Sequence, residues 1–536
     1  MRRNPMHTVT FYDQQQPLES ALAVLAAAGC TVGPPVTSVF TLLDTFDGRL
    51  HAADLRLVSV STGRVTELRL ADGRSAVAAL PAPQAWASTS APTATPGAPA
   101  SSVARFAADL PPGPFRSRLA AATEPRALMP VFTYRSVVRG FVKYDRSTKV
   151  IVSGSIFEQP TVGRRVDPSA PWLIEVVEQA GHSRAFDSID EALAGLRLER
   201  ATHDAITSIA GLAGVALSGV PPSPTVAMHP STPAGEAVRA VLANLSATIE
   251  TNWQPTIDEL DTEFLHDLRV AVRRTRSVLT EIKNVVADEI RDHYRGEFGW
   301  LGNVTSRPRD LDVYLLEWDS YIAPLAPEVR SHLAPVVQLL QRHRSEAHVG
   351  LVQAMRSERA AELRSSWATA LTTAGFAEQD KSRLAGEPIG AVVAARIRAV
   401  HRKLIGDGRR ISAGSPAEAL HELRKEAKRL RYLVECFASV LPGKQRKAFV
   451  DELKALQDNL GEHQDAGVHA GELRDVAHDL DAVTTTTATL VALGQLSEQL
   501  DRRCAETRNE FAVRFRAYDS KRVRSALDEL LSGLDG

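Results

Sequence analysis

The sequence predicts an α+β multidomain protein with a strand-rich region over residues 1–217 and an all-helical region over residues 234–530. Three observations support this fold class. Short runs of β-branched and aromatic residues occur before about residue 200, and some alternate with polar residues at period two. From about residue 234, long segments carry apolar residues at the helical period of 3.6. One basic helical stretch within these segments occurs twice.

The composition of the chain bounds its class before any motif is considered. Its 536 residues exceed what one hydrophobic core holds, so we expect several domains. Lys and Arg total 63 against 64 Asp and Glu, so any site for a polyanion must be a local concentration of cations. The three cysteines lie far apart, and no apolar run reaches the ~20 residues that cross a bilayer. We therefore expect a cytoplasmic protein without disulfides or a membrane span.

The N-terminal region contains a succession of strand signals. The strand-like runs are residues 36–43, 55–60, 65–70, 131–138, 140–144, 149–157 and 172–177. Helices are expected over residues 18–28 and 189–217. Residues 81–101 consist mostly of Pro, Ala, Ser and Thr, a composition typical of a disordered loop, and the proline-rich residues 218–233 are expected to form a linker.

The doubled stretch in the C-terminal region predicts two amphipathic helices with cationic polar faces. At about 100° per residue, one face of each helix is basic. The two basic faces consist of His266, Arg269, Arg273 and Arg276, and of His421, Arg424, Lys425, Lys428, Arg431 and Tyr432. The opposite faces are apolar and consist of Leu265, Leu268, Val272 and Leu279, and of Leu420, Leu423, Ala427, Leu430 and Val434. Because cations one turn apart repel each other, the pattern indicates an anionic ligand.

A single offset relates the two copies. His421 follows His266 by 155 residues, and Asp465 follows Asp310 by the same 155 residues. Because one shift aligns both landmarks without a gap, we predict two similar helical bundles, over about residues 234–385 and 386–530, related by a pseudo-two-fold axis. This arrangement would bring the two basic faces together as one groove.

A row of arginines and lysines at one-turn spacing suits a linear polyanion with regularly repeating charge. Arginine favours two-pronged binding of phosphate, and the histidines add donors when protonated rather than acting as catalysts. We predict that Asp310 and Asp465 cap helices or orient an arginine rather than bind a metal. The alternative for the whole pattern is a pair of solvated surface helices, which the recurrence in two equivalent positions makes the weaker interpretation.

The doubled His-x-x-Arg helices, each followed by an Asp-containing segment, resemble the CHAD family, the conserved histidine α-helical domain, over about residues 234–530. The resemblance implies a pseudo-symmetric pair of helical bundles that binds inorganic polyphosphate through its basic face, with polyphosphate granules among the candidate partners. It implies this role for His266, Arg269, Arg273, Arg276, His421, Arg424, Lys428 and Arg431. To these we add the neighbouring Arg274, Arg309, Lys425 and Tyr432.

The N-terminal region is similar to the CYTH family, the triphosphate tunnel metalloenzymes. Residues 43–50 and 53–57 resemble the family's Phe-Asp-Thr segment and its Leu-Arg strand, and residues 66–69 resemble the next strand. The resemblance implies an antiparallel, barrel-like β tunnel. The Glu-x-Glu-x-Lys opening that holds the metal in that family is replaced here by residues 6–13, which contain no glutamate. Glu175 and Glu178 are candidate remnants of the metal site. We predict a degenerate tunnel with no catalytic residues and no cofactor. Mg²⁺ or Mn²⁺ would be required only if the domain is active.

The leading hypothesis from the sequence is therefore a non-catalytic protein that binds inorganic polyphosphate. A metal-dependent triphosphate or polyphosphate hydrolase that uses the N-terminal tunnel is the alternative from the enzyme class. Nucleic-acid binding is a third alternative, and it is less favoured because Tyr432 is the only aromatic residue on the basic faces.

Overall fold

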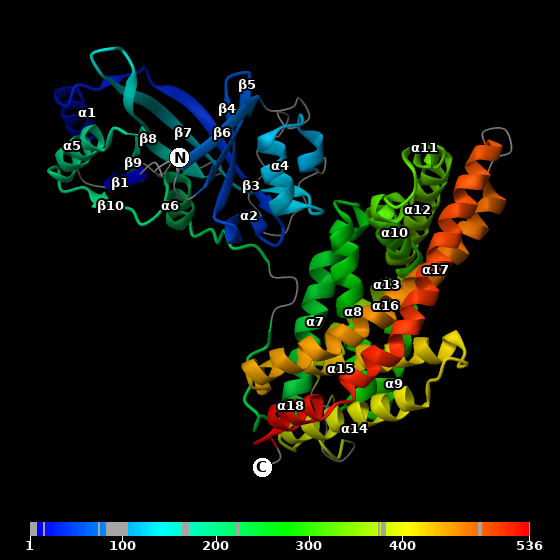
Figure 1. Ribbon diagram of the computed structural model, residues 1–536. Helices are drawn as coiled ribbons and strands as arrows, with labels where there is room; N and C mark the ends of the chain where they lie inside the picture. Colours follow the sequence, from blue (N-terminus) through cyan, green and yellow to red (C-terminus); the bar gives the residue numbers. More distant parts are fainter. Residues whose placement is uncertain are drawn as a thin grey trace. The chain divides into compact units, whose positions relative to one another are not determined.

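The computed structural model describes residues 8–13, 17–72, 75–81, 105–162, 171–179, 181–220, 225–373, 376, 382–480 and 485–534. The chain divides into two compact units, Met1–Pro222 and Ser223–Gly536 (Figure 1). The predicted disordered loop at residues 81–101 lies, apart from Pro81, outside the described residues, as do residues 221–224 of the predicted linker. The exact linker ends and the repeat boundary near residue 385 stay predictions.

The N-terminal unit is built on one antiparallel sheet, as the sequence predicts. Its strands are β1 (Thr8–Asp13), β2 (Thr31–Val32), β3 (Val36–Thr45), β4 (Leu55–Thr62), β5 (Val65–Asp72), β6 (Ser75–Pro81), β7 (Leu128–Tyr144), β8 (Val150–Val162), β9 (Trp172–Glu178) and β10 (Glu199–Arg200). The strand order is β10-β1-β9-β8-β7-β3-β4-β5-β6, and β2 pairs with β7. The long central strands β7 and β8 curve strongly through the unit (Figure 1).

Five helices accompany the sheet within the described residues of this unit. They are α1 (Leu18–Ala27), α2 (Arg49–Ala52), α4 (Pro114–Thr123), α5 (Ser183–Ala194) and α6 (Ala205–Leu212). The prediction of a single helix over residues 189–217 is wrong, because Gly195 caps the C-terminus of α5 and the chain then forms β10, which pairs with β1. Asp204 starts the second helix by accepting a hydrogen bond from the Thr207 backbone N–H.

The C-terminal unit is helical, which confirms the predicted fold class. Its helices are α7 (Ala234–Ile257), α8 (Thr262–Glu281), α9 (Asp288–Val304), α10 (Ser306–Ile322), α11 (Pro327–Ser331), α12 (Ala334–Met355), α13 (Glu358–Thr372), α14 (Ile389–Arg410), α15 (Ala417–Cys436), α16 (Gly443–Asp479), α17 (Thr487–Tyr518) and α18 (Lys521–Leu531). Within the ranges described for the whole chain, every helix is too short or too polar to cross a membrane.

The helices repeat at the offset found in the sequence. Helices α14, α15 and α16 begin 155 residues after α7, α8 and α9, since 389 − 234, 417 − 262 and 443 − 288 all equal 155. The long α16 occupies the place of α9 and α10 together. The first copy is interrupted at Thr305 because Pro308 has no N–H for a continuous helix. The equivalent residue of the second copy is His463, which has an N–H, and α16 continues through it. Pro308 thus lies in the first turn of a new helix, where it is tolerated.

A reciprocal set of backbone hydrogen bonds joins the two repeats at the N-termini of α7 and α14. The bonds run from Ala234 N to Glu387 O (2.8 Å), from Ile389 N to Thr232 O (2.9 Å), from Gly235 N to Ala385 O (2.8 Å) and from Gly390 N to Pro230 O (2.9 Å). Each bond has a partner displaced by 155 residues at both ends, and Pro233 forms a β-bridge with its equivalent, Pro388. Such self-complementary contacts are the signature of a two-fold axis, and here they also satisfy N–H groups that helix termini leave free.

The predicted apolar faces of α8 and α15 are buried in one hydrophobic core that runs through both repeats. All nine apolar side chains of these faces are at most 4% exposed, namely Leu265, Leu268, Val272 and Leu279 of α8 and Leu420, Leu423, Ala427, Leu430 and Val434 of α15. The burial of these faces confirms the helical phase that the sequence predicts, and it leaves the basic faces on the other side of each helix.

Helix α14 offers a matched test of this packing. A Cβ atom added at Gly408 would overlap the ring of Phe515, whereas one added at Gly406 would meet no atom within 4 Å. We expect Gly408→Ala to lower the free energy of unfolding by about 1–3 kcal/mol through overpacking. The control, Gly406→Ala, should raise it by about 0.5–1 kcal/mol because alanine favours the helix. Chemical denaturation of both variants checks this, and equal stability of the two would contradict the packing.

Candidate functional site

Helix α8 is held in place at its start by a capping aspartate. The Asp261 carboxylate accepts hydrogen bonds from the backbone N–H groups of Glu263 (2.9 Å) and Phe264 (3.1 Å). These bonds satisfy two of the free donors of the first turn and fix where the helix begins. Because the apolar face then packs into the core, Arg269 and Arg273 are carried on the opposite, basic face.

Helices α8 and α15 bring cations from the two repeats within electrostatic reach of each other. Burial and the nearby guanidinium groups of Arg424, Arg273 and Arg269 lower the pKa of Lys428 to about 8, although Asp465 partly offsets the effect. Burial and Arg273 likewise lower the pKa of Arg269 to about 10, although Asp310 partly offsets the effect. We call these four residues, Arg269 and Arg273 of α8 with Arg424 and Lys428 of α15, the cation cluster.

Arg273 and Lys428 are equivalent residues of the two repeats, since they lie 155 positions apart. Both side chains are half-buried. In the part of the chain that the structure describes, neither makes a hydrogen bond or an ion pair, and the buried Arg273 Nε has no acceptor. Half-buried like charges without an ion-pair partner destabilise a protein, and a bound anion would relieve their repulsion.

Arg269 and Arg424 form the second equivalent pair of the cluster, and protein groups position both guanidinium groups. Arg269 Nη1 donates to Gly302 O (3.1 Å) and to the hydroxyls of Thr305 and Ser306 (both 3.0 Å). Arg424 Nη2 donates to Asp465 Oδ1 at 3.0 Å, which is the contact expected of a carboxylate that orients an arginine. The Nε atom of each arginine is buried and lacks an acceptor among the described groups, so each retains capacity for a ligand.

Most of the other predicted site cations pair with carboxylates. Arg274 and Arg431 both pair with Glu435, each at 2.6 Å. Lys425 is exposed and pairs with Glu422 at 2.6 Å, and Arg309 pairs with Glu263 at 3.5 Å while donating to Thr262 O. Arg276 lies against Gly302 and within reach of Arg295 and Arg429, which together with burial lower its pKa. The structure therefore separates the twelve predicted residues into a central cation cluster and an outer set.

Comparison with known proteins identifies the helical unit. The family model of the CHAD domain matches residues 239–474, from α7 into α16. The chain contains a CHAD domain. The cation cluster lies on the two helices that carry the His-x-x-Arg pattern of this domain.

Two curated relatives and two solved structures are similar to this chain. The relatives are the uncharacterized proteins MT2285 and Rv2226 of Mycobacterium tuberculosis, from strains CDC 1551 / Oshkosh and ATCC 25618 / H37Rv. Each is 27% identical over 373 residues, and the match covers 67% of this chain and 66% of the relative. The chain thus spans slightly less than two thirds of their length. A CHAD domain from Ricinus communis is 24% identical with a TM-score of 0.46, covering 55% of this chain and 96% of that structure. PptA from Streptomyces chartreusis is 18% identical with a TM-score of 0.42, and the match covers 54% of this chain and 100% of that structure.

The two histidines of the repeated pattern, His266 and His421, are half-buried near the start of their helices. His421 Nδ1 lies 2.9 Å from Gln464 Oε1, so this ring is oriented by the residue that replaces Arg309 in the second repeat. Tyr432 lies within electrostatic reach of Arg269, across the boundary between the two repeats. Asp310 likewise faces Arg269, as its equivalent Asp465 faces Arg424.

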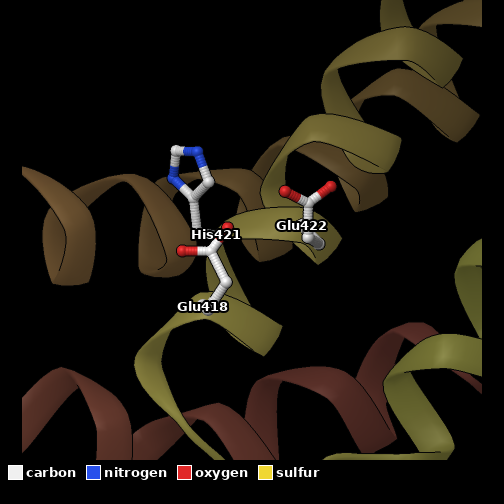
Figure 2. Close-up of side chains that lie close together, drawn as sticks. All are labelled: Glu418, His421 and Glu422. Carbon is white, nitrogen blue, oxygen red and sulfur yellow. The ribbon is translucent and has the colours of Figure 1, made fainter.

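Among the described residues, one group of side chains has ligand atoms close enough together to hold a metal ion. Figure 2 shows Glu418, His421 and Glu422 on neighbouring turns of α15, and their ligand atoms lie within 4.8 Å of one another. Glu422 is already engaged by Lys425, and the group is largely exposed. The prediction that the protein needs no metal stays a prediction, and these residues are where a metal would be sought in the CHAD domain.

The interior of the N-terminal unit is filled mainly by apolar and aromatic side chains. Phe40 and Tyr134 stack with ring centroids 4.8 Å apart, and Phe157 packs edge-on against Phe40 at 5.6 Å. The apolar side of α6, including Ile206 and Ile209, completes this cluster.

A few charged groups remain at the edge of this apolar cluster. Arg56 of β4 lies 3.7 Å from Asp204, and Arg69 of β5 pairs with Glu67 at 3.0 Å. Burial and the Asp204 carboxylate raise the pKa of Glu175 to about 7. Glu178 is buried, at 6% exposed. Arg56 and Arg69 thus have carboxylate partners, in contrast to Arg273 and Lys428 of the cation cluster.

Sequence reasoning missed the counter-ions of the outer cations. Glu435 and the buried Glu281 neutralise arginines of the opposite repeat, since Arg274 pairs with Glu435 and Arg429 approaches Glu281 at 3.8 Å. Arg274 and Arg429 are equivalent residues, so these crossing contacts also follow the pseudo-symmetry. The 155-residue offset relates the two arginines but not the two acids, which lie 435 − 281 = 154 positions apart, so the sequence offered no direct signal for these ion pairs.

The electrostatic strain at Lys428 predicts a gain in stability when its charge is removed. The folded-state pKa of about 8 lies below the ordinary lysine value of 10.5, so the unfolded chain binds more protons between these pH values. Stability of the natural protein should therefore rise with pH across this window. At pH 7, Lys428→Met should raise the free energy of unfolding by roughly 1–3 kcal/mol, and the gain should shrink toward pH 10.5. Urea denaturation at both pH values measures this, with the exposed, ion-paired Lys447 as the control for Lys→Met. A loss of stability would contradict the strain.

Proposed function

We propose that the CHAD domain of this protein binds inorganic polyphosphate through the cation cluster and that the protein acts by binding rather than by catalysis. The observation that carries this proposal is the Arg273–Lys428 pair, which is half-buried and forms no ion pair with a described residue. An anion that bridged the two helices would relieve the repulsion between them. Charge-assisted hydrogen bonds to phosphate would supply about 1.5–3 kcal/mol each.

The arrangement of the cluster favours a chain of phosphates over a single small anion. Arg269 and Arg273 are one turn apart on α8, and Arg424 and Lys428 are one turn apart on α15, so donors recur at a spacing of about 5–6 Å. A ligand with charge repeated along its length can contact both pairs at once. Nucleic acid offers such charge too, but its bases would find only Tyr432 as an aromatic platform on these faces.

This proposal predicts strong effects of charge removal within the cluster. Arg273→Ala combined with Lys428→Ala should lower the affinity for long-chain polyphosphate on the order of 10²-fold at low salt, because each cation contributes a charge-assisted hydrogen bond. The slope of log affinity against log salt should become shallower by about one for each cation removed. Titration of defined-length polyphosphates at two salt concentrations measures both quantities.

The matched control removes two arginines that are not in the cluster. Arg359 and Arg364 of α13 pair with Glu297 and Glu250 on the surface. Their double alanine variant loses the same charge and should bind polyphosphate within about twofold of the natural protein. Equal weakening in both double variants would mean that binding follows net charge and not the cluster. Competition by RNA and DNA on the same titration distinguishes the nucleic-acid alternative.

The hydrolase alternative makes a separate prediction. Because apolar and aromatic residues fill the interior of the N-terminal unit and residues 6–13 contain no glutamate, the protein should release no phosphate from tripolyphosphate with Mg²⁺ or Mn²⁺ above a blank. A phosphate-release assay on the full chain measures this. Metal-dependent release that is lost in Glu175→Gln would overturn the non-catalytic proposal.

A further inference from the structure

Lys428 differs from the other lysines whose contacts the structure describes along α14, α15 and α16. Lys403, Lys425 and Lys447 are exposed and pair with carboxylates at 2.6–2.8 Å. Lys428 is half-buried, and it makes no hydrogen bond or ion pair with a described residue. Its amino group lies within electrostatic reach of Arg424, Arg273 and Arg269, whose effect exceeds that of the Asp465 carboxylate.

Such an environment makes a lysine a nucleophile. Nearby cations and partial burial disfavour the protonated form, and the pKa of about 8 leaves about a tenth of the Lys428 amines neutral at pH 7 and half at pH 8. An exposed lysine with an ordinary pKa has less than about a thousandth of its amines neutral at pH 7. The same arginines that cause this shift can also hold a phosphate group beside the amine.

We propose that Lys428 is a covalent modification site for small acyl phosphates, whose phosphate is bound by Arg273, Arg269 and Arg424 while the acyl carbon meets the amine. The proposal rests on the proposed function in one respect, namely that the cation cluster binds phosphate. It adds a second ligand class to the site and a way to regulate it.

The reaction balances without any further reactant. The neutral Lys428 Nζ attacks the acyl carbon, a C–N bond forms, and the bond between that carbon and the bridging phosphate oxygen breaks. Inorganic phosphate departs with the electron pair, and the nitrogen loses one proton to phosphate or water, which leaves a neutral amide. The arginines stabilise the negative charge that develops on the leaving phosphate.

Acylation would weaken the binding of polyphosphate. The amide at position 428 carries no charge, so the cluster loses one of its two central cations and the added acyl group occupies space between α8 and α15. Bound polyphosphate would in turn cover the amine. The two events should therefore exclude each other.

The test treats the full chain with acetyl phosphate and follows acetylation of each lysine by quantitative mass spectrometry. We expect Lys428 to be acetylated at least tenfold faster than Lys425 or Lys447, and excess polyphosphate should suppress this reaction alone. Arg273→Ala should slow it severalfold. A neutral acetylating reagent without a phosphate group, applied in parallel, should show a smaller preference for Lys428.

The outcomes separate this inference from the proposed function. If Lys428 is acetylated no faster than Lys425 while polyphosphate still binds, the inference is overturned and the proposed function stands. If Lys428 is acetylated rapidly but polyphosphate neither protects it nor binds the protein, the acylation site stands and the proposed function is overturned. Preferential acetylation with protection supports both.

Discussion

Four reciprocal backbone hydrogen bonds between the N-termini of α7 and α14 set the pseudo-two-fold relation on which the candidate site depends. Because every bond has an equivalent 155 residues away, the two repeats meet through the same surface of each. Residues near the axis of such an arrangement approach their own equivalents. A cation placed near the axis on one repeat therefore faces a cation of the other, and Arg273 and Lys428 are in this relation. The repulsion between them is a consequence of duplication as much as of local sequence.

Some cations of the helical unit pair with carboxylates and others form no ion pair with a described residue, and this difference is the main reason to expect a ligand. Away from the axis, arginines of one repeat are neutralised by acids of the other, as in the pairing of Arg274 with Glu435. Near the axis, Arg273 and Lys428 lack such acids among the described residues, although the chain as a whole holds 63 basic and 64 acidic side chains. A protein with ample acidic residues that leaves these two cations without a carboxylate loses some stability at this place. Loss of stability at a ligand site is a common accompaniment of function.

Much of this arrangement could be predicted from the sequence, because it depends on periodicity. The period of 3.6 identified the buried faces of α8 and α15, and the doubled histidines identified the repeat. The division of the basic residues into cluster and outer set could not be predicted, because it depends on contacts such as Arg274 with Glu435, 161 positions apart. The packing of α6 against the sheet was also not predictable from the sequence, since Ile206 and Ile209 would suit any core. The break between α9 and α10 at Thr305 is a local effect of Pro308, which helical periodicity alone does not reveal.

The central claim is that two helices of two repeats form one site, and stoichiometry tests it most directly. Isothermal titration of the full chain with a short polyphosphate of defined length, long enough to span two turns of a helix, counts the ligands bound per protein. One ligand per chain is expected, with Arg269→Ala and Arg424→Ala each weakening that same binding event. Two ligands per chain, each abolished in only one of the two variants, would show that the basic helices are separate sites and would contradict the claim.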